Sequence, residues 1–132
     1  MDRKKLYESA RLARRSAYAP YSSITVGATL LTRSGKVYTG ANIENAAYSP
    51  SVCAERVAFF KAISDGERDF AAIAVAGGKA DGEPTEMFTP CGVCRQVMAE
   101  FCDENFKIIL GEDKEISFNE LLPYGFNKDK LK

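Results

Sequence analysis

Three cysteines give this chain its clearest chemical signal. Cys53 stands two residues before Glu55, and Pro90 precedes the C-x-x-C pair Cys91 and Cys94. Three thiolates can hold a tetrahedral zinc ion and leave its fourth position open to water, which is typical of a catalytic zinc site. A fourth protein ligand would close the site and make it structural. The pattern therefore favours a catalytic zinc.

The positions of these cysteines on predicted helices support one shared site. Cys91 and Cys94 are three residues apart near the start of a predicted helix, so their sulfurs share one face. Cys53 is expected near the start of another helix, and exposed N–H groups at a helix start favour a thiolate. A lone C-x-x-C would also suit a buried pair or a redox motif. Cys102 lies eight residues beyond Cys94, roughly 12 Å along a helix, so we expect a core residue and not a fourth ligand.

The residues beside Cys53 suggest how the site works. Three thiolates around Zn²⁺ leave a net negative charge, and Arg56 could offset part of it by donating hydrogen bonds to the sulfurs. Its other interpretation is a solvent-facing helix arginine. The chain contains no histidine, so a proton shuttle must use a carboxylate, lysine, tyrosine or thiol. Glu55 is the candidate beside the metal, although a carboxylate at a helix start can also serve the helix dipole alone.

Composition narrows the class of protein. The length of 132 residues predicts one domain, residues 1–132. Lysine plus arginine equal aspartate plus glutamate at 18 each, which argues against a nucleic-acid partner and favours a small uncharged substrate. No long apolar run predicts a membrane span, and residues 1–5 lead into an amphipathic pattern unlike a signal peptide. Reduced cysteines then predict a cytoplasmic protein.

Hydrophobic periodicity and turn residues predict the order α-β-β-α-β-α-β, followed by a short strand and helix. The expected helices cover residues 2–17, 52–65 and 91–102, and the expected strands cover residues 24–32, 36–42, 70–76, 106–110 and 115–118. Ser51 and Thr89 are the expected N-caps, and Ser117 with Glu120 forms a capping box. We expect a loop at 77–86 and a frayed polar tail after residue 126. This order predicts an α/β fold with a mixed sheet and helices on its faces.

The chain resembles the cytidine deaminases, in particular their small, single-domain, homotetrameric type. The resemblance rests on the two cysteine motifs and on residues 19–22 (APYS), 26–28 (VGA), 42–46 (NIENA) and 121–123 (LLP). It implies a three-layer α-β-α sandwich with a mixed β-sheet and one Zn²⁺ per chain. It also implies hydrolytic deamination of cytidine and 2′-deoxycytidine to uridine and 2′-deoxyuridine, with release of ammonia, in pyrimidine salvage.

The same resemblance assigns roles to individual residues. Glu55 would take a proton from the zinc-activated water, protonate N3 of the pyrimidine and deliver a proton to the departing amine. The backbone N–H of Ala54 would bind the base carbonyl, and the Thr89 carbonyl would bind the amino group. Asn42 and Glu44 would hydrogen-bond the ribose 3′-hydroxyl, which both donates and accepts.

Three further positions concern the base. By the resemblance, Tyr48 and Phe126 reach into the site of a neighbouring subunit in a homotetramer, where Phe126 stacks on the base. Relatives commonly carry phenylalanine where this chain has Ile24, on the first strand beside the base. Isoleucine is apolar but cannot stack, so this position bears on base packing and on the choice of substrate.

Two other functions compete with this interpretation. One is a related deaminase with the same metal motifs, such as blasticidin S deaminase; Glu44 and the run Asn45-Ala46-Ala47-Tyr48 favour a nucleoside instead. The other is a zinc-stabilised binding module without turnover, against which the open coordination position and Glu55 argue. Thiolate ligands favour zinc over iron or cobalt. The sequence does not rank cytidine against deoxycytidine, because both carry the 3′-hydroxyl that Asn42 and Glu44 would bind.

Overall fold

The computed structural model describes residues 2–132, and Met1 lies outside them. The predicted order of helices and strands is confirmed. The elements are α1 (Arg3–Ala13), β1 (Ile24–Thr32), β2 (Val37–Ala41), α2 (Ala54–Ser64), β3 (Phe70–Lys79), α3 (Gly92–Phe101), β4 (Lys107–Ile109), β5 (Glu115–Ser117) and α4 (Phe118–Leu121), with 3-10 helices at Arg14–Ser16 and Lys128–Leu131. Within the described part of the chain, no helix has the length and apolar character needed to cross a membrane.

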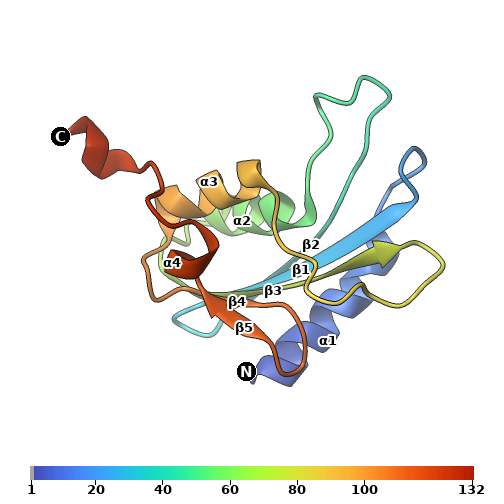
Figure 1. The fold of residues 1–132 in the computed structure, drawn as a ribbon, viewed down its shortest axis with the longest axis horizontal. Coiled ribbons are helices and arrows are strands. Elements are labelled where there is room, and N and C mark those ends of the chain that lie inside the picture. The colour runs from blue at the N-terminus through green and yellow to red at the C-terminus, as the bar shows by residue number, and fades with distance from the viewer. Residues whose placement is uncertain (1) are drawn as a thin grey trace.

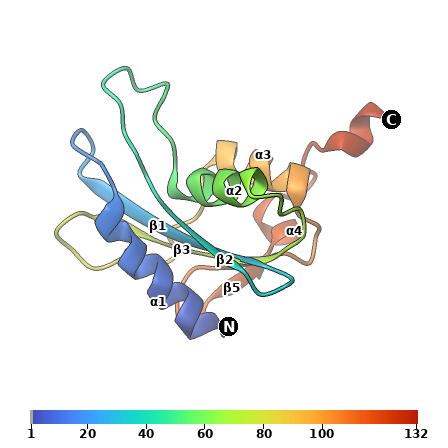
Figure 2. The same cartoon turned by 180° about the vertical axis from the view of Figure 1, so that it is seen from behind.

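The strands form one five-stranded sheet in the order β2-β1-β3-β4-β5. β3 and β4 are parallel, whereas the other three neighbouring pairs are antiparallel. Helix α1 covers one face of the sheet, and α2 and α3 cover the other (Figure 1; Figure 2 shows the same layers from behind). The prediction of a three-layer α/β fold with a mixed sheet is therefore confirmed.

The sheet has a hydrophobic core on each face, and strand β3 contributes side chains to both. Ile73 and Val75 belong to the core beneath α2 and α3. The alternating alanines Ala72, Ala74 and Ala76 belong to the smaller core beneath α1. Because side chains of a strand alternate between the two faces, this segment is apolar at every position, as predicted for a strand buried on both faces.

Helix α2 lies very close to β2, and a glycine makes this approach possible. A Cβ atom at Gly40 would lie 2.7 Å from the backbone nitrogen of Ala58 and would also collide with the carbonyl oxygen of Ala54. Only a residue without a side chain fits between the strand and the helix backbone. Gly40 thereby fixes the height of the first turn of α2 above the sheet, and this turn carries the residues next to Cys53.

Gly40→Ala should therefore disturb the start of α2. We expect a loss of stability of about 1–3 kcal/mol, the usual cost of overpacking, together with weaker zinc binding. Gly82→Ala is the matched control, because its nearest heavy atom would be 3.8 Å away. Thermal unfolding and metal analysis of both variants are the measurements. A Gly40→Ala protein that melts and holds zinc like the unmodified chain would show that this contact does not position the site.

Both helix starts near the cysteines differ from the prediction. The N-cap of α2 is Cys53 and not Ser51, and the N-cap of α3 is Cys91 and not Thr89. The Ser51 hydroxyl instead accepts a hydrogen bond from the backbone N–H of Asn45 at 2.9 Å, within the preceding loop. Neither cysteine forms a side-chain hydrogen bond that caps its helix, so both sulfurs remain available for another partner.

Three other predictions about local structure were wrong. β3 continues to Lys79, three residues into the expected loop, because Gly77, Gly78 and Lys79 pair with β1. The first helix changes to a 3-10 turn after Ala13. The polar tail contains a 3-10 helix, Lys128–Leu131, where the Asn127 side chain accepts a hydrogen bond from the Asp129 amide.

Candidate active site

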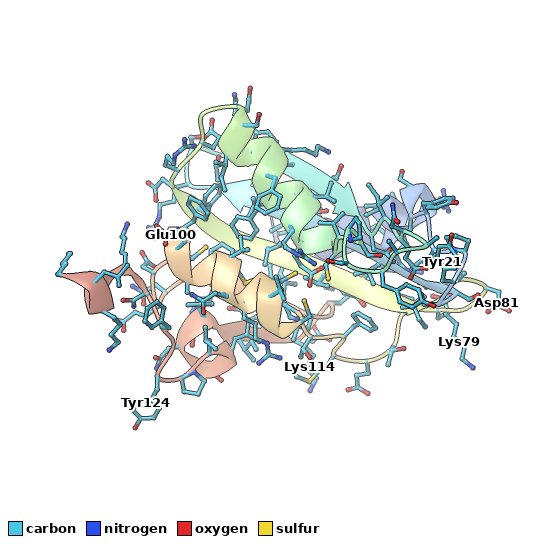
Figure 3. All side chains as sticks on the ribbon, turned by 90° about the horizontal axis from the view of Figure 1, so that it is seen from above. Tyr21, Lys79, Asp81, Glu100, Lys114 and Tyr124 are labelled. Carbon is cyan, nitrogen blue, oxygen red and sulfur yellow. The ribbon has the colours of Figure 1, made fainter. Side chains whose placement is uncertain are left out.

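The two helix starts bring three sulfurs together. The Sγ atom of Cys91 lies 3.4 Å from that of Cys53 and 3.5 Å from that of Cys94, and all three lie within 4.8 Å of one another. Cys53 and Cys91 occupy the N-cap positions of α2 and α3, while Cys94 is in the first turn of α3. Figure 3 shows sulfur atoms between the two helices, above the sheet. This arrangement can hold one metal ion.

The electrostatics of this cluster favour a thiolate at Cys53 in particular. A hydrogen bond with Cys94 and, second among the favourable effects, one from Arg56 lower the pKa of Cys53 to about 5, against the opposing effect of burial. The same hydrogen bond with Cys53 raises the pKa of Cys94. Arg56 donates to Cys53 Sγ at 3.5 Å, which is the contact that the sequence predicted for a residue neutralising the sulfurs.

Cys102 is separate from this cluster. It is the C-cap of α3, at the opposite end of the helix from Cys91, and packs against the main core. Burial raises the pKa of its thiol. The metal-binding group in the described residues therefore has three protein ligands, which is the number found in catalytic zinc sites.

Glu55 lies beside the sulfurs in the first turn of α2 and is only 3% exposed. Burial raises the pKa of its carboxyl group to about 7, because the charged form loses its hydration. A group with a pKa near neutrality can both accept and return a proton efficiently. Glu55 is not part of the three-sulfur group, so its carboxylate is free for proton transfer.

The cluster opens into a cavity of about 410 Å³, a size suited to a small molecule. Eight of the residues expected at the site line it: Ile24, Asn42, Glu44, Cys53, Glu55, Arg56, Thr89 and Cys91. Five further lining residues were not predicted: Ser22, Val26, Ser51, Val52 and Phe88. Cys94 and Ala54 are buried and are not among the residues that line the cavity.

Ser22 is the unpredicted residue with the most direct link to an expected one. Its hydroxyl donates to one carboxylate oxygen of Glu44. The other oxygen accepts the backbone N–H groups of Tyr21 at 3.0 Å and Ser22 at 3.1 Å. These bonds, led by the one from the Ser22 hydroxyl, lower the pKa of Glu44. The motif at residues 19–22 contained this signal, since a turn rich in N–H donors is a natural partner for a nearby carboxylate.

Asn42 connects β1 to the segment after β2. Its side-chain oxygen accepts the backbone N–H of Val26 at 2.8 Å, and its amide nitrogen donates to the carbonyl of Ile24 at 2.9 Å. One N–H and one lone pair of the amide remain for a ligand. The two bonds hold the amide rigidly at the wall of the cavity.

Tyr48 and Phe126 do not line the cavity of their own chain. Tyr48 is 71% exposed and its ring meets that of Tyr21 edge-on, at 6.2 Å between centroids. Phe126 is 58% exposed, and its carbonyl accepts a hydrogen bond from Gln96. The C-terminal segment extends away from the sheet (Figure 1).

The fold and the site agree with the comparisons to known proteins. Residues 1–110 match the family described as "Cytidine and deoxycytidylate deaminase zinc-binding region". A cytidine deaminase of Sporosarcina psychrophila is 49% identical over 135 aligned positions, covering 99% of this chain and 96% of the relative. A Blasticidin-S deaminase of Bacillus cereus is 28% identical, covering 79% of this chain and 78% of the relative.

Among solved structures, the cytidine deaminase of Burkholderia pseudomallei superposes with a TM-score of 0.85 at 43% identity, covering 96% of this chain and all of the other. The site and fold define a zinc-dependent deaminase domain. The chain belongs to the cytidine and deoxycytidylate deaminase family, and its cofactor is Zn²⁺.

Proposed function

We infer that this chain is an enzyme that hydrolyses cytidine, and also 2′-deoxycytidine, to the corresponding uridine and ammonia. The observation that carries this inference is the buried carboxylate of Glu55 beside three clustered thiols at the base of a cavity. Relatives named cytidine deaminase, aligned over nearly the whole chain, support the choice of substrate. A place in pyrimidine salvage follows from the products, because such an enzyme recovers the uracil nucleoside.

Cys53, Cys91 and Cys94 are the residues that would hold the zinc. A bound zinc ion acts as a Lewis acid and lowers the pKa of water, which supplies the nucleophile for attack on C4 of the base. Glu55 would perform the proton transfers: its carboxylate would take one proton from the water and pass it to N3, and would then take the second proton of that water, once its oxygen is bonded to C4, and deliver it to the departing amine. Since the pKa of Glu55 is about 7, it can serve in both directions at neutral pH.

The remaining site residues would orient the nucleoside. Ala54 is the first residue of α2, and N–H groups in a first helical turn lack intrahelical partners, so its N–H can bind the base carbonyl. Thr89 lines the cavity, where its carbonyl can accept from the amino group. The free groups of Asn42 and Glu44 would hold the 3′-hydroxyl.

The contact between Ser22 and Glu44 makes this ribose site testable. Ser22→Ala removes one of the donors to Glu44 and should raise KM for cytidine about threefold to tenfold with little change in kcat, the scale of one ordinary hydrogen bond, because two backbone donors to Glu44 remain. Ser22→Thr should restore KM because it keeps the hydroxyl. The matched control is Ser64→Ala, at the exposed end of α2. Equal kinetics in Ser22→Ala and the unmodified enzyme would show that Glu44 needs no orientation by Ser22.

Homotetramer formation, with sites shared between subunits, remains a proposal. Its support is that Tyr48 and Phe126 are large exposed aromatic side chains outside the cavity of their own chain. We therefore propose that each completes the site of a neighbour, with Phe126 against the base. The single domain of residues 1–132 and a cytoplasmic location also remain predictions; the latter is supported by four cysteines that form no disulfide with one another.

Parallel assays with cytidine, 2′-deoxycytidine and blasticidin S test the choice of substrate. Loss of the ultraviolet absorbance of each amino-pyrimidine and release of ammonia report turnover. We expect rapid turnover of both nucleosides and little with blasticidin S. Preferential turnover of the antibiotic would replace the proposed function by the related activity, and release of no ammonia from any substrate would favour a binding module.

A further inference from the structure

Phe88 stands out among the residues of the cavity. It is the one aromatic side chain among the thirteen that line it, and the other apolar members are the aliphatic residues Ile24, Val26 and Val52. A flat pyrimidine gains most from a wall on which it can pack face to face or offset. Within one chain, Phe88 offers the aromatic part of that wall.

The sheet beneath Phe88 is shaped to receive its ring. A Cβ atom added to Gly77 would lie 2.7–2.8 Å from three adjacent carbons of the ring. Their nearly equal distances place a face of the ring, and not its edge, against the glycine. Gly77 pairs with Val26 of β1, which itself lines the cavity. One face of the Phe88 ring therefore covers the sheet at Gly77, and the same residue lines the cavity.

The preceding loop holds Phe88 in this orientation. The backbone N–H of Thr85 donates to the carbonyl of Gly77 at 2.7 Å, which fastens the loop to β3. Met87 adopts a φ of 51°, a left-handed conformation that is uncommon for a residue with a side chain. Met87 is exposed, whereas the next residue, Phe88, is partly buried against the main core. The strained turn thus directs the aromatic ring inward.

We propose that Phe88 is a specificity-determining residue on which the pyrimidine base packs, in a chain whose first strand contributes the aliphatic Ile24. This inference rests on the proposed function, because it assumes that a pyrimidine nucleoside occupies the cavity. The Phe88 ring forms the wall on the sheet side of the base, in the cavity that Asn42 and Glu44 also line. A planar base gains binding free energy by packing against this aromatic ring, and a puckered base gains less.

Uridine and 5,6-dihydrouridine test this distinction directly. They share their sugar and polar groups, but saturation of the C5–C6 bond makes the second base non-planar. Calorimetry on the zinc-loaded protein should give tighter binding of uridine, and Phe88→Leu should reduce the preference about twofold to tenfold, the scale of an aromatic contact. Phe88→Tyr should retain the preference. Phe60→Leu, at an exposed phenylalanine of α2 outside the cavity, is the matched control.

An unchanged preference in Phe88→Leu, or equal binding of the two ligands by the unmodified chain, would overturn the proposal. If Phe88→Leu does not fold, Phe88→Met preserves more of the side-chain volume and should show the same loss. Binding and turnover are separate measurements. A chain that shows the Phe88-dependent preference but does not deaminate cytidine would contradict the proposed function alone, whereas turnover without the preference would contradict the Phe88 inference alone.

Discussion

Glu55→Gln is expected to retain its zinc and to lose nearly all turnover of cytidine. Glutamine keeps the size of the side chain and the start of α2 but cannot exchange protons. General acid–base groups contribute on the order of 10²–10⁴-fold, and Glu55 would act in several steps of the reaction. The chain has no histidine that could substitute for it. Steady-state kinetics and metal analysis on the same preparation are the measurements.

Glu100→Gln provides the control for this experiment, because it is the same chemical change at an exposed residue of α3; Glu100 is labelled in Figure 3. It should keep both zinc and activity. A Glu55→Gln protein with one zinc per chain and about a tenth of normal turnover, far above the residual expected on loss of a general acid–base group, would show that Glu55 is not the proton shuttle.

Serine at Cys53, Cys91 or Cys94 is expected to remove the metal, whereas Cys102→Ser is expected to retain it. The first three sulfurs form the metal-binding group, and a hydroxyl is a far poorer zinc ligand than a thiolate. Cys102 lies at the other end of α3 and packs against the core. Its variant therefore serves as the internal control for replacing a thiol by a hydroxyl.

Metal content of the four purified variants is the measurement. The three ligand variants should also lose stability, since metal binding contributes to folding, while Cys102→Ser should lose only the packing of one partly buried side chain. Loss of zinc from Cys102→Ser, with retention in any one of the other three variants, would contradict the open three-thiolate site.

The order of elements was predictable because each carries a local signal. The apolar run from Phe70 to Ala76 predicts a buried strand because it is short and is followed by glycines, and Ser117 with Glu120 forms the capping box that its spacing predicts. The extension of β3 to Lys79 was not predictable in this way. Glycines have low strand propensity, and Gly77 and Gly78 are in the strand because β1 pairs with them.

The same distinction, between local sequence signals and contacts made only in the folded chain, applies to the site. Cys53, Glu55, Cys91 and Cys94 could be found from spacing, because short-range motifs specify which side chains meet at a helix start. Phe88 could not, because its place in the cavity depends on a turn and on the absence of a side chain at Gly77, which lies eleven residues earlier in the chain but contacts the ring in the fold.

Ile24 shows how the tertiary arrangement changes the interpretation of a single position. The resemblance of the sequence to the family draws attention to Ile24, where an aromatic ring is expected on the first strand. In the structure Ile24 lines the cavity together with Phe88, so an aromatic wall is still present, supplied by a different element. The substitution at position 24 therefore need not remove aromatic packing from the site.

Zinc titration of the metal-free chain is the most direct test of the central claim, that three thiolates and Glu55 form a cytidine deaminase site. The protein is stripped with a chelator, zinc is added in steps, and cytidine turnover and bound metal are measured at each step. We predict that turnover rises in proportion to bound zinc and reaches its maximum at one ion per chain. A chain that binds one zinc and releases no ammonia from cytidine, or one that is fully active without metal, would contradict the account.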